Sequence, residues 1–362
     1  MSRRITVLPA AVTLVLLVTA SSACTVKNSD EPGAAGAASG KAGVGSAELA
    51  DGSKTKVALV PGGAHPYFQP WKQAGEEAKK TLKLGDVTFD ETAEWDQQKQ
   101  NNLLSTLAAR GYNAFGIFGV SPTDINTTFA DLKSQGFAVA SLASCPAGDT
   151  NEADFCLSTD VELAAYKAAK AAIEAMGGKG ALVHLTGNNV DANTQLRKRG
   201  VERAVKETGG KVTLLQTITD IDKDLQTAQK AVSDLLAAKG GHIAGIVSTA
   251  YNPAVAAAEA VRESGSKAKV VAIDDDAKIL SSIKNGSVSA TVVQNPVGQA
   301  EIGTWALALL QTKQCTMKQP GKIVDSGSFV VTKDNVTNYD DARKATTAQL
   351  KKQFADEFLS CG

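Results

Sequence analysis

Short apolar stretches alternate with longer amphipathic stretches along most of this chain. The first apolar stretch is Lys56–Pro61, which is followed by a Gly62–Gly63 turn and by a helix-like segment from Phe68 to Leu84. These apolar stretches are continuous, as expected of strands that are covered on both faces of a sheet. The pattern therefore predicts repeated strand–helix units built around a parallel sheet.

The same unit recurs in both halves of the chain. In the first half we expect strands and helices in turn at Val87–Phe89, Gln97–Arg110, Ala114–Phe118, Ile125–Gln135 and Ala138–Leu142. In the second half we expect strands at Ala181–Leu185, Val212–Leu215, Ile243–Val247, Val270–Ile273 and Ala290–Val293, and helices near Leu163–Met176, Leu196–Thr208, Leu225–Ala238, Ala254–Ser264 and Lys278–Asn285. The prediction is an α/β protein of two doubly wound, Rossmann-like parallel-sheet lobes, with ligands beyond the carboxyl ends of the strands.

Length and composition agree with this fold class. A chain of 362 residues fits two lobes of roughly 100–150 residues each. Hydrophobic residues make up 43% of the chain, which excludes disorder, and aromatic residues only 5%, which fits an aliphatic interior. The 38 Lys and Arg residues balance 38 Asp and Glu residues. Because no global field attracts polyanions, we expect no nucleic-acid partner.

The N-terminus has the pattern of a secretory signal. Arg3 and Arg4 precede an apolar run from Ile5 to Ala20, and small residues then lead to Cys24. This junction resembles the lipobox of bacterial lipoproteins, in which the cysteine is acylated, although Ser21 stands where leucine is usual. Ordinary secretion is the alternative. We expect a signal peptide over residues 1–23, lipidation at Cys24 and a location on the outer face of the cell membrane.

Residues 24–55 are rich in Gly, Ala and Ser and offer little to bury, so we expect a flexible tether there. Four cysteines remain beyond it, and in an exported protein an even number predicts disulfides. Three pairings exist, and we favour the local ones, Cys145 with Cys156 and Cys315 with Cys361. A metal site is disfavoured, because no CxxC or HxxH spacing occurs and the three histidines are scattered.

Motifs for several kinds of chemistry are absent from the sequence. There is no phosphate-binding P-loop, no GxGxxG after a first strand and no GxSxG nucleophile elbow. Asp274–Asp276 follow a predicted strand, but they lack the alternating ligands of a calcium loop. We expect one inward ligand acceptor and two solvated carboxylates that open a helix. The sequence thus supports neither a cofactor nor an enzyme.

Five segments at predicted strand ends form a recognisable series, namely His65–Phe68, Ser121–Asp124, Asn193–Gly200, Val271–Asp274 and Ala290–Gln294. In this order, together with the signal and tether, they resemble the ribose-binding-like family of type I periplasmic sugar-binding proteins. The resemblance covers roughly residues 56–335. It implies a monomeric two-lobe receptor that closes on one sugar or sugar alcohol and delivers it to the permease of an ABC importer.

The resemblance also implies ligand contacts in the first lobe, namely His65, Tyr67, Phe68, Trp95, Asp96 and Ser144. The aromatic residues would stack on a sugar face, although Tyr67 and Phe68 could instead belong to the core. Asp96 could instead be the N-cap of a helix. Ala143-Ser144-Cys145 stands where pentose binders of the family carry Asp-Arg. We therefore expect a different sugar, a polyol, a cyclitol or another small polar metabolite.

In the second lobe the implied contacts are Asn193, Gln195, Arg197, Tyr251, Asn252, Asp274 and Gln294. The register places Gln195 where the family has an arginine, so Gln195 and Arg197 are alternative donors. Asn252 could instead be a turn or cap residue before Pro253. Asp274 and Gln294 match the family best, as a hydroxyl acceptor and as a ligand contact near the hinge.

We expect the lobes to be 56–158 with 295–324, and 159–294 with 325–362. Three hinge segments would join them, near residues 158–160, 294–295 and 324–328. A sensory receptor and, less favoured, a hydrolase acting on a sugar-like substrate are the alternative functions. Repressors of the LacI type share the fold but need an N-terminal helix-turn-helix, whose place is taken here by the signal and tether.

Overall fold

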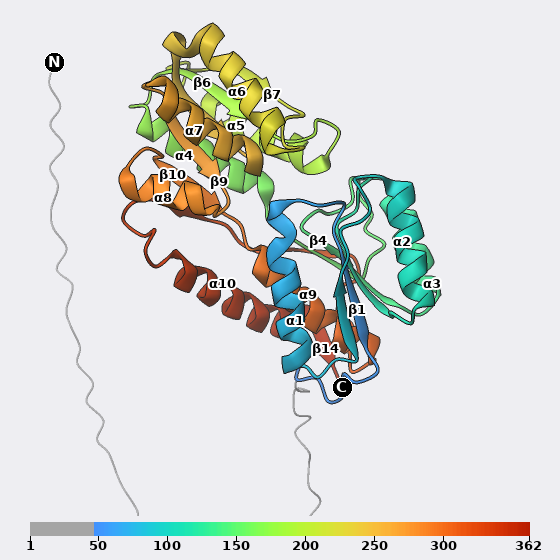
Figure 1. The fold of residues 1–362 in the computed structure, drawn as a ribbon. Helices are drawn as coiled ribbons and strands as arrows, with labels where there is room; N and C mark the ends of the chain where they lie inside the picture. The colour runs from blue at the N-terminus through green and yellow to red at the C-terminus, as the bar shows by residue number, and fades with distance from the viewer. Residues whose placement is uncertain (1–46) are drawn as a thin grey trace, which may run out of the picture. The chain divides into compact units, whose positions relative to one another are not determined.

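The computed structural model describes residues 47–362. The signal, most of the tether and Cys24 lie outside the described residues. Two six-stranded sheets and one two-stranded sheet make up the β-structure of the described part. The two large sheets are the centres of two lobes, each with helices on both faces (Figure 1). The prediction of two doubly wound lobes is confirmed.

The first lobe has strand order β12-β5-β4-β3-β1-β2, with parallel pairing throughout. Its strands are β1 Lys56–Val60, β2 Asp86–Phe89, β3 Ala114–Ile117, β4 Ala138–Leu142, β5 Phe155–Ser158 and β12 Lys322–Asp325. Helices α1 (Gln69–Thr81) and α9 (Pro296–Gln311) cover one face, and α2 (Gln97–Ala109) and α3 (Ile125–Ser134) cover the other (Figure 1).

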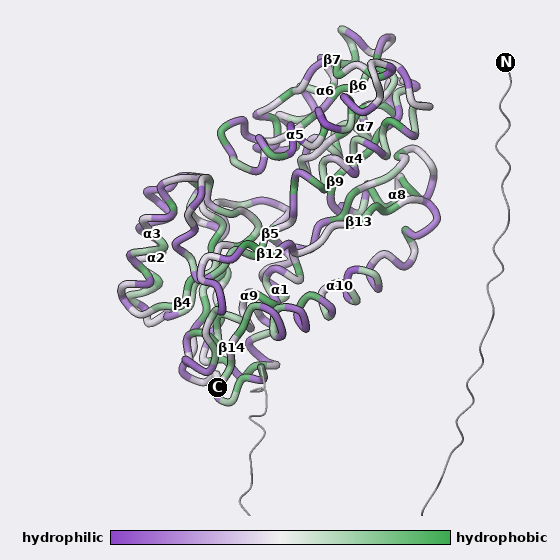
Figure 2. The backbone as a smooth tube through the Cα atoms, turned by 180° about the vertical axis from the view of Figure 1, so that it is seen from behind, coloured by the Kyte–Doolittle hydropathy of each residue, from purple (hydrophilic) through white to green (hydrophobic). Residues whose placement is uncertain are grey.

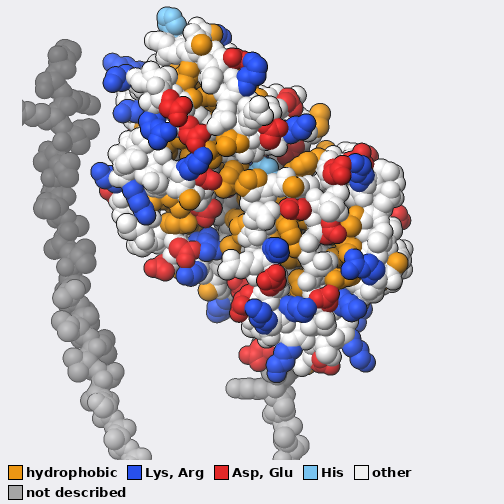
Figure 3. Space-filling model, viewed as in Figure 1, with side chains coloured by type: hydrophobic (Ala, Val, Ile, Leu, Met, Phe, Trp, Pro, Cys, Tyr) orange, Lys and Arg blue, Asp and Glu red, His pale blue; other side chains and the backbone are white. Residues whose placement is uncertain are grey.

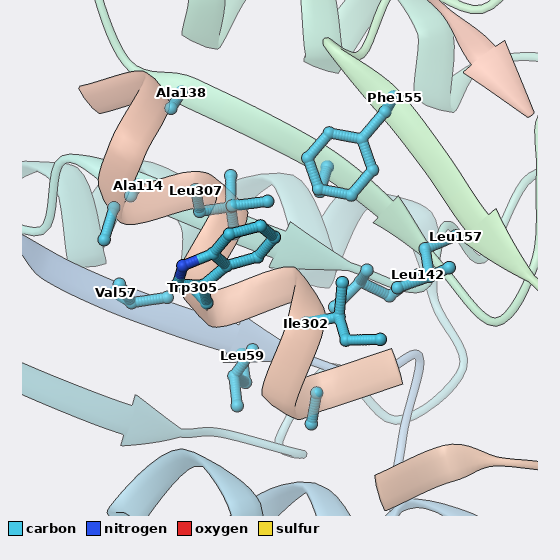
Figure 4. Packing of buried hydrophobic residues seen from close by; sticks show 14 of the residues in the cluster. Val57, Leu59, Ala114, Ala138, Leu142, Phe155, Leu157, Ile302, Trp305 and Leu307 are labelled. Atoms are coloured by element: carbon cyan, nitrogen blue, oxygen red, sulfur yellow. The ribbon is translucent and has the colours of Figure 1, made fainter. Parts of the chain in front are cut away.

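Helix α9 is buried on nearly every side. Its residues Ile302, Trp305 and Leu307 point between the side chains of β1, β3, β4 and β5 (Figure 4). Hydrophobic colour in Figure 2 runs along α9, whereas α10 (Tyr339–Gln353) is largely hydrophilic. A helix that is apolar all round is expected only where it is enclosed, and α9 is enclosed by the sheet, α1 and the C-terminal segment.

The second lobe has strand order β13-β10-β9-β8-β6-β7, and only β13 is antiparallel to its neighbour. Its strands are β6 Gly180–Leu185, β7 Val212–Ile218, β8 Ile243–Ser248, β9 Lys269–Ile273, β10 Ala290–Val293 and β13 Phe329–Val331. Its helices are α4 Val161–Ala175, α5 Ala192–Lys206, α6 Leu225–Lys239, α7 Tyr251–Ser264 and α8 Ala277–Asn285. Helices α4 and α5 pack on one face, and α6, α7 and α8 on the other.

Small residues let α4 and α5 approach closely. Five buried alanines of α4 form one side of the contact, namely Ala164, Ala165, Ala168, Ala169 and Ala172. On α5, a Cβ at Gly200 would lie only 2.2 Å from the carbonyl oxygen of Glu162. The glycine is therefore required by the close contact of the two helix backbones.

Three crossings join the lobes, as expected. The chain passes from β5 to α4 after Ser158, from β10 to α9 after Val293, and from β12 to β13 after Asp325. The remaining short elements are the single turns η1 (Pro66–Phe68), η2 (Gly240–His242) and η3 (Phe354–Phe358), together with β11 (Cys315–Met317) and β14 (Leu359–Cys361).

The expected tether is wrong at its C-terminal end. Within residues 47–55 the chain already packs on the first lobe, where Trp305 Nε1 donates to the Ala47 carbonyl at 3.0 Å. The Ala50 N–H donates to Gln314 Oε1 at 2.9 Å, and Thr55 is buried. Ala47 and Leu49 add apolar contacts to the core of this lobe. The folded body thus begins before the first strand.

The assignment of residues 325–362 to the second lobe is wrong for the C-terminal segment. Leu350, Phe354 and Leu359 belong to the same buried cluster as the strands of the first lobe. Strand β14 pairs with β11, which follows α9. The physical reason is that the buried face of α9 needs a cover, and the apolar residues of the C-terminal segment provide it.

Both disulfides join the cysteines that we favoured. Cys145 pairs with Cys156, and Cys315 pairs with Cys361. The second bond links β11 to β14 and so closes the C-terminal end of the chain onto the first lobe. Within residues 47–362 no helix is both long and apolar enough to cross a membrane. On the face shown in Figure 3, acidic and basic side chains are interspersed, in keeping with the balanced composition.

Candidate ligand-binding site

A cavity of about 430 Å³ receives side chains from both lobes. Its volume lies within the range that is typical of small-molecule sites. The first lobe contributes His65, Tyr67, Phe68, Glu94, Trp95, Phe118, Val120 and Ala143. The second lobe contributes Gly187, Asn188, Val190, Asp191, Asn193, Arg197, Asp220, Asp222, Lys223, Ala250, Tyr251, Asp274 and Gln294.

The carboxyl ends of the strands position this lining. Ala143 directly follows β4, Asp274 directly follows β9, and Gln294 directly follows β10. Because parallel strands end at the same edge of a sheet, residues far apart in the chain meet there. The cavity therefore lies where the sequence predicted a ligand.

Backbone strain is concentrated at the cavity. Seven non-glycine residues within the described part of the chain have positive φ, and five of them line the cavity: Glu94, Trp95, Ala143, Asp220 and Asp274. A left-handed conformation costs an L-residue about 1–2 kcal/mol. Such residues persist where the surrounding structure holds them, often at binding sites. The clustering of these residues therefore indicates, independently of the shape of the cavity, that it is a binding site.

Aromatic rings form the first-lobe wall. Phe68 packs edge-on against Phe118, with ring centroids 5.2 Å apart, and Trp95 lies 6.2 Å from Phe68 and 6.0 Å from Phe118. Trp95 is 44% exposed, so its ring is available to a ligand. A Cβ at Gly63 would lie 2.6 Å from Trp95 Nε1, so the turn after β1 needs glycine for the ring to fit.

Asp274 is the most deeply buried acid of the cavity, with 5% exposure. Its Oδ1 accepts from Gln294 Nε2 at 2.8 Å, and its backbone carbonyl accepts from the Thr291 hydroxyl at 2.7 Å. Burial raises the pKa of the Asp274 carboxyl to about 7, against the effect of the Gln294 hydrogen bond. The pair presents a carboxyl and an amide, which together can serve ligand hydroxyls as acceptor and donor.

Helix α5 brings a second polar group to the cavity. Asp191 caps this helix by accepting from the Asn193 N–H at 3.0 Å. Burial raises the pKa of Asp191, and the Arg197 guanidinium works in the opposite direction. Arg197 Nε is buried without a hydrogen-bond partner. A buried donor of this kind is costly unless a ligand satisfies it.

Two contacts link the lobes across the cavity. Asn193 Nδ2 donates to the Ala143 carbonyl at 3.2 Å, and His65 Nε2 lies 3.5 Å from Asp222 Oδ2. The side chains of His65 and Asp222 are only 10% and 19% exposed. These contacts join groups that stand on opposite sides of the hinge, so they depend on how far the lobes are closed.

Nine of the thirteen predicted site residues line the cavity, and their contact with a ligand stays a prediction. The nine are His65, Tyr67, Phe68, Trp95, Asn193, Arg197, Tyr251, Asp274 and Gln294. Phe68 combines the two alternatives of the sequence analysis, because it is buried in the core and also forms part of the wall. Of the two alternative donors on α5, Arg197 lines the cavity and Gln195 does not.

Two predicted first-lobe residues lie outside the cavity. Asp96 is the N-cap of α2, where its carboxylate accepts a hydrogen bond from the Lys99 N–H at 2.8 Å. Ser144 is buried, and its carbonyl accepts from the Ser141 hydroxyl at 2.6 Å. At this turn it is Ala143 that lines the cavity.

Two predicted second-lobe residues are also placed elsewhere. The Gln195 amide bonds to the Asn189 carbonyl, on the side of α5 away from the cavity lining. Asn252 is buried in the first turn of α7, where its N–H donates to Asp222 Oδ1 at 2.8 Å. Its side-chain amide donates to the Asp222 carbonyl at 3.0 Å. Asn252 thus holds Asp222 in place.

Sequence reasoning missed four acids of the lining, namely Glu94, Asp191, Asp220 and Asp222. Asp191 stands just before the predicted helix that begins near Leu196. An acid at this position is expected to cap the helix, which gives no sign that it also lines a cavity. Asp222 comes four residues after β7, beyond the strand end that we inspected. The turn from Thr219 to Asp222 follows a strand end, and this was the available signal.

A second, larger cavity of about 1050 Å³ lies on the first lobe. It is lined by residues 47–52, by the end of α1 and by parts of α9 and α10. No strand ends at this cavity. Of the positive-φ residues in the described chain, only Lys83 lines it. The smaller cavity between the strand ends is therefore the candidate site. Groups of three or more His, Cys, Asp or Glu side chains suited to a metal ion are absent among residues 47–362.

Comparisons with known proteins agree with this geometry. A family model described as a periplasmic binding protein domain matches residues 57–314. The D-allose-binding periplasmic protein of Escherichia coli (strain K12) is 24% identical over 257 residues, which are 68% of this chain and 80% of that protein.

Solved structures with the same fold include two solute-binding proteins of ABC transporters. One, from Burkholderia graminis C4D1M in complex with D-arabinose, has a TM-score of 0.71 and 23% identity and covers 80% of this chain and 99% of its own. The other, from Actinobacillus succinogenes 130z with bound D-allose, has a TM-score of 0.71 and 22% identity and covers 79% of this chain and 100% of its own.

Proposed function

The chain belongs to the periplasmic binding protein family, and on that basis we propose that it is a solute-binding protein that captures a small polyhydroxylated ligand and delivers it to an ABC importer. One observation carries the proposal: a single cavity is lined by hydrogen-bonding groups from both lobes, beside three crossings of the chain. A ligand that bonds both lobes stabilises the closed form relative to the open form. A ligand that touched one lobe would not shift this equilibrium.

The lining matches the surface of a sugar or sugar alcohol. Asn193, Arg197, Asp274 and Gln294 offer donors and acceptors for hydroxyl groups, and the ring of Trp95 covers the apolar C–H face. Both named solved structures hold sugars, D-arabinose and D-allose. The charged Asp-Arg pair that pentose binders carry after the fourth strand is replaced by Ala143-Ser144, so hydroxyl recognition rests more on the second lobe.

The protein acts outside the cytoplasm, tethered to the outer face of the membrane through an acylated Cys24, and it binds its ligand without chemical conversion. The signal-like residues 1–23 and the small residues before Cys24 support this part of the proposal. The importer permease is the partner, and the receptor is a monomer. Replacement of Cys24 by Ser should release the protein into the medium, and a variant that stays on the membrane would exclude lipidation.

The binding function is tested by a thermal-shift and calorimetric screen of sugars, polyols, cyclitols, amino acids and nucleosides. A ligand present at 100 times Kd should stabilise the protein by about 2.7 kcal/mol. Arg197→Ala should then weaken binding more than 10-fold, because Asp191 and Asp274 lose a nearby cation and the ligand loses a donor. Gln195→Ala, two residues away on α5 but outside the cavity, is the matched control and should change affinity less than 3-fold. Absence of binding in every class, or release of a converted product, would refute the receptor function.

A further inference from the structure

The acidic and basic side chains of the cavity are not balanced. Its lining contains Glu94, Asp191, Asp220, Asp222 and Asp274, against Arg197 and Lys223. The outer charges are exposed or paired elsewhere: Glu94 forms an ion pair with Lys99, and Asp220 and Lys223 are both exposed. The imbalance therefore belongs to the inner part of the cavity.

Three acids and one fixed cation form that inner part. Asp191, Asp222 and Asp274 line the cavity together with Arg197, which acts on the carboxyls of Asp191 and Asp274. These four side chains carry a formal charge of −2 when all three acids are ionised. Burial raises the pKa of Asp191 and of Asp274, and the charge of Asp222 adds to the shift at Asp191. The inner part of the cavity thus disfavours the charged form of two carboxyls, and a cation from outside would relieve this cost.

Hydrogen bonds within the second lobe hold the carboxyl groups of Asp222 and Asp274. Asn252 occupies Asp222 Oδ1 with its N–H, and Oδ2 points across the cleft to His65 at 3.5 Å. Gln294 occupies Asp274 Oδ1. One oxygen of each acid is thus fixed by the protein, which holds the carboxyl group in place for a partner from outside.

Aromatic rings surround the place where Asp222 meets the first lobe. The ring of Tyr251 lies 5.8 Å from that of His65, and Trp95 and Phe68 each lie 6.2 Å from it. Aromatic faces attract an organic cation within about 6 Å. A hard metal ion instead needs six or more oxygen ligands, which this aromatic surrounding does not offer.

We propose that the ligand carries a protonated amine as well as hydroxyl groups, as an amino sugar or an amino polyol does. This inference rests on the proposed function and narrows its ligand class. The ammonium group binds between the Asp191 and Asp222 carboxylates and the rings beside His65, while Asn193, Asp274 and Gln294 bond the hydroxyls. A neutral sugar would fill the same space but leave the inner acids uncompensated.

The test compares matched ligands that differ in one group. The full chain is titrated calorimetrically at pH 6.5 with D-glucosamine, D-galactosamine, D-mannosamine and glucamine, with the parent hexoses and sorbitol, and with the three N-acetylated hexosamines. We expect at least one amine to bind more than 10-fold tighter than both its hydroxyl parent and its N-acetyl form. If every neutral compound binds as tightly as its amine, the charge inference is overturned and the receptor function stands. If none of these compounds binds, the amine inference is overturned, and the wider ligand screen decides the receptor function separately.

A pair of variants tests whether the Asp222 carboxylate binds the ammonium group of the ligand. Asp222→Asn keeps an oxygen for the Asn252 N–H but removes the negative charge, so it should weaken amine binding more than 10-fold and binding of the neutral parent less than 3-fold. Asp224→Asn is the matched control, because this exposed acid lies two residues further along the chain and outside the cavity lining, where it caps α6 by accepting from the Thr227 N–H. Its replacement should change the amine affinity less than 3-fold. Equal losses for amine and parent in Asp222→Asn would overturn the assignment.

Discussion

At the scale of single residues, Asp274 combines three unfavourable features at one position. It has a φ of +65°, its carboxyl is buried, and its neighbour Asp275 carries the same charge. Each feature raises the free energy of the folded, ligand-free protein. A residue of this kind is retained because it binds something, and its replacement should therefore stabilise the protein that has no ligand.

We expect Asp274→Asn to stabilise the ligand-free protein in a pH-dependent way. The folded-state pKa of about 7 lies above the ordinary value of 3.8, so ionisation of the carboxyl favours unfolding. The advantage of asparagine should be absent below about pH 3.8, grow between pH 4 and 7, and stay constant above, at no more than about 4 kcal/mol. Urea unfolding at pH 4, 5.5 and 8 measures it. Equal advantages at pH 4 and pH 8 would contradict the assignment.

Asp220→Asn is the control for this series. Asp220 is exposed, and hydrogen bonds from Thr219 and Asn189 lower the pKa of its carboxyl. Its contribution to stability is present above the unfolded-state pKa and is lost as the pH falls. The control should therefore show a small effect of opposite sign.

Among the predicted residues, those that stand directly after a strand line the cavity, and their contact with a ligand stays a prediction. Asp274 and Gln294 could be placed in the site because a parallel sheet brings strand ends to one edge. Asp222 could not, because the four residues after β7 can turn in several ways and its position depends on bonds to Asn252. Gln195 does not line the cavity for another reason, because on a helix a shift of two residues places a side chain on a different face.

At the scale of elements, a hydrogen-bonded cluster connects the cavity to the crossings. Tyr67 donates to Gln299 Oε1 at 2.9 Å, and Gln299 Nε2 donates to the Ser326 hydroxyl at 3.0 Å. Ser326 lies 3.1 Å from the Thr159 hydroxyl. Ser326 and Thr159 belong to two crossings, and Gln299 lies in the first turn of α9, just after the third. Movement at the hinge is thus coupled to a residue of the cavity wall.

We expect Gln299→Leu to destabilise the protein by about 1–3 kcal/mol, because the Tyr67 hydroxyl loses its acceptor and the Ser326 hydroxyl keeps only Thr159 as a partner. The same variant should change the ligand affinity, since its bonds join two crossings to the cavity. Urea unfolding and ligand titration measure the two effects. Glu301→Gln, two residues further along α9, removes only a half-exposed ion pair with Lys351 and should cost less than about 1 kcal/mol. Equal behaviour of the two variants would show that the cluster does not couple hinge and cavity.

The helices and strands that the sequence analysis did not predict show no clear periodic pattern of hydrophobic residues. Strand β5 has only four residues and follows the loop that the Cys145–Cys156 disulfide closes, so its apolar run is too short to predict a strand. Helix α9 is apolar on all sides, and α10 is mostly polar, so neither shows the single apolar stripe that identifies a surface helix. Their places depend on contacts with each other and with the sheet, which no local pattern encodes.

At the scale of the whole molecule, a disulfide joins the C-terminal segment to the first lobe. The Cys315–Cys361 bond spans 46 residues, and these include a crossing to the second lobe and the return. The bond therefore limits the separation of segments that would otherwise be far apart in the unfolded chain.

Replacement of both Cys315 and Cys361 by alanine should lower the free energy of unfolding by up to about 4 kcal/mol, as expected for a closed loop of this length. The Cys145–Cys156 pair closes only 11 residues, and its removal should cost up to about 3 kcal/mol. Guanidinium unfolding of the two double variants under identical conditions ranks them. A smaller loss for the Cys315–Cys361 pair would show that the C-terminal segment is held by packing alone.

The packing of Ala47 on α9 has a mechanical consequence. Because Trp305 and Gln314 hold residues 47–50, any pull from the N-terminal side of Ala47 is taken up by the first lobe. The three crossings lie beyond this point, so the pull does not pass through them. With the proposed anchor at Cys24, the first lobe would therefore be the lobe held near the membrane, and closure would bring the second lobe, which carries the inner acids, toward it.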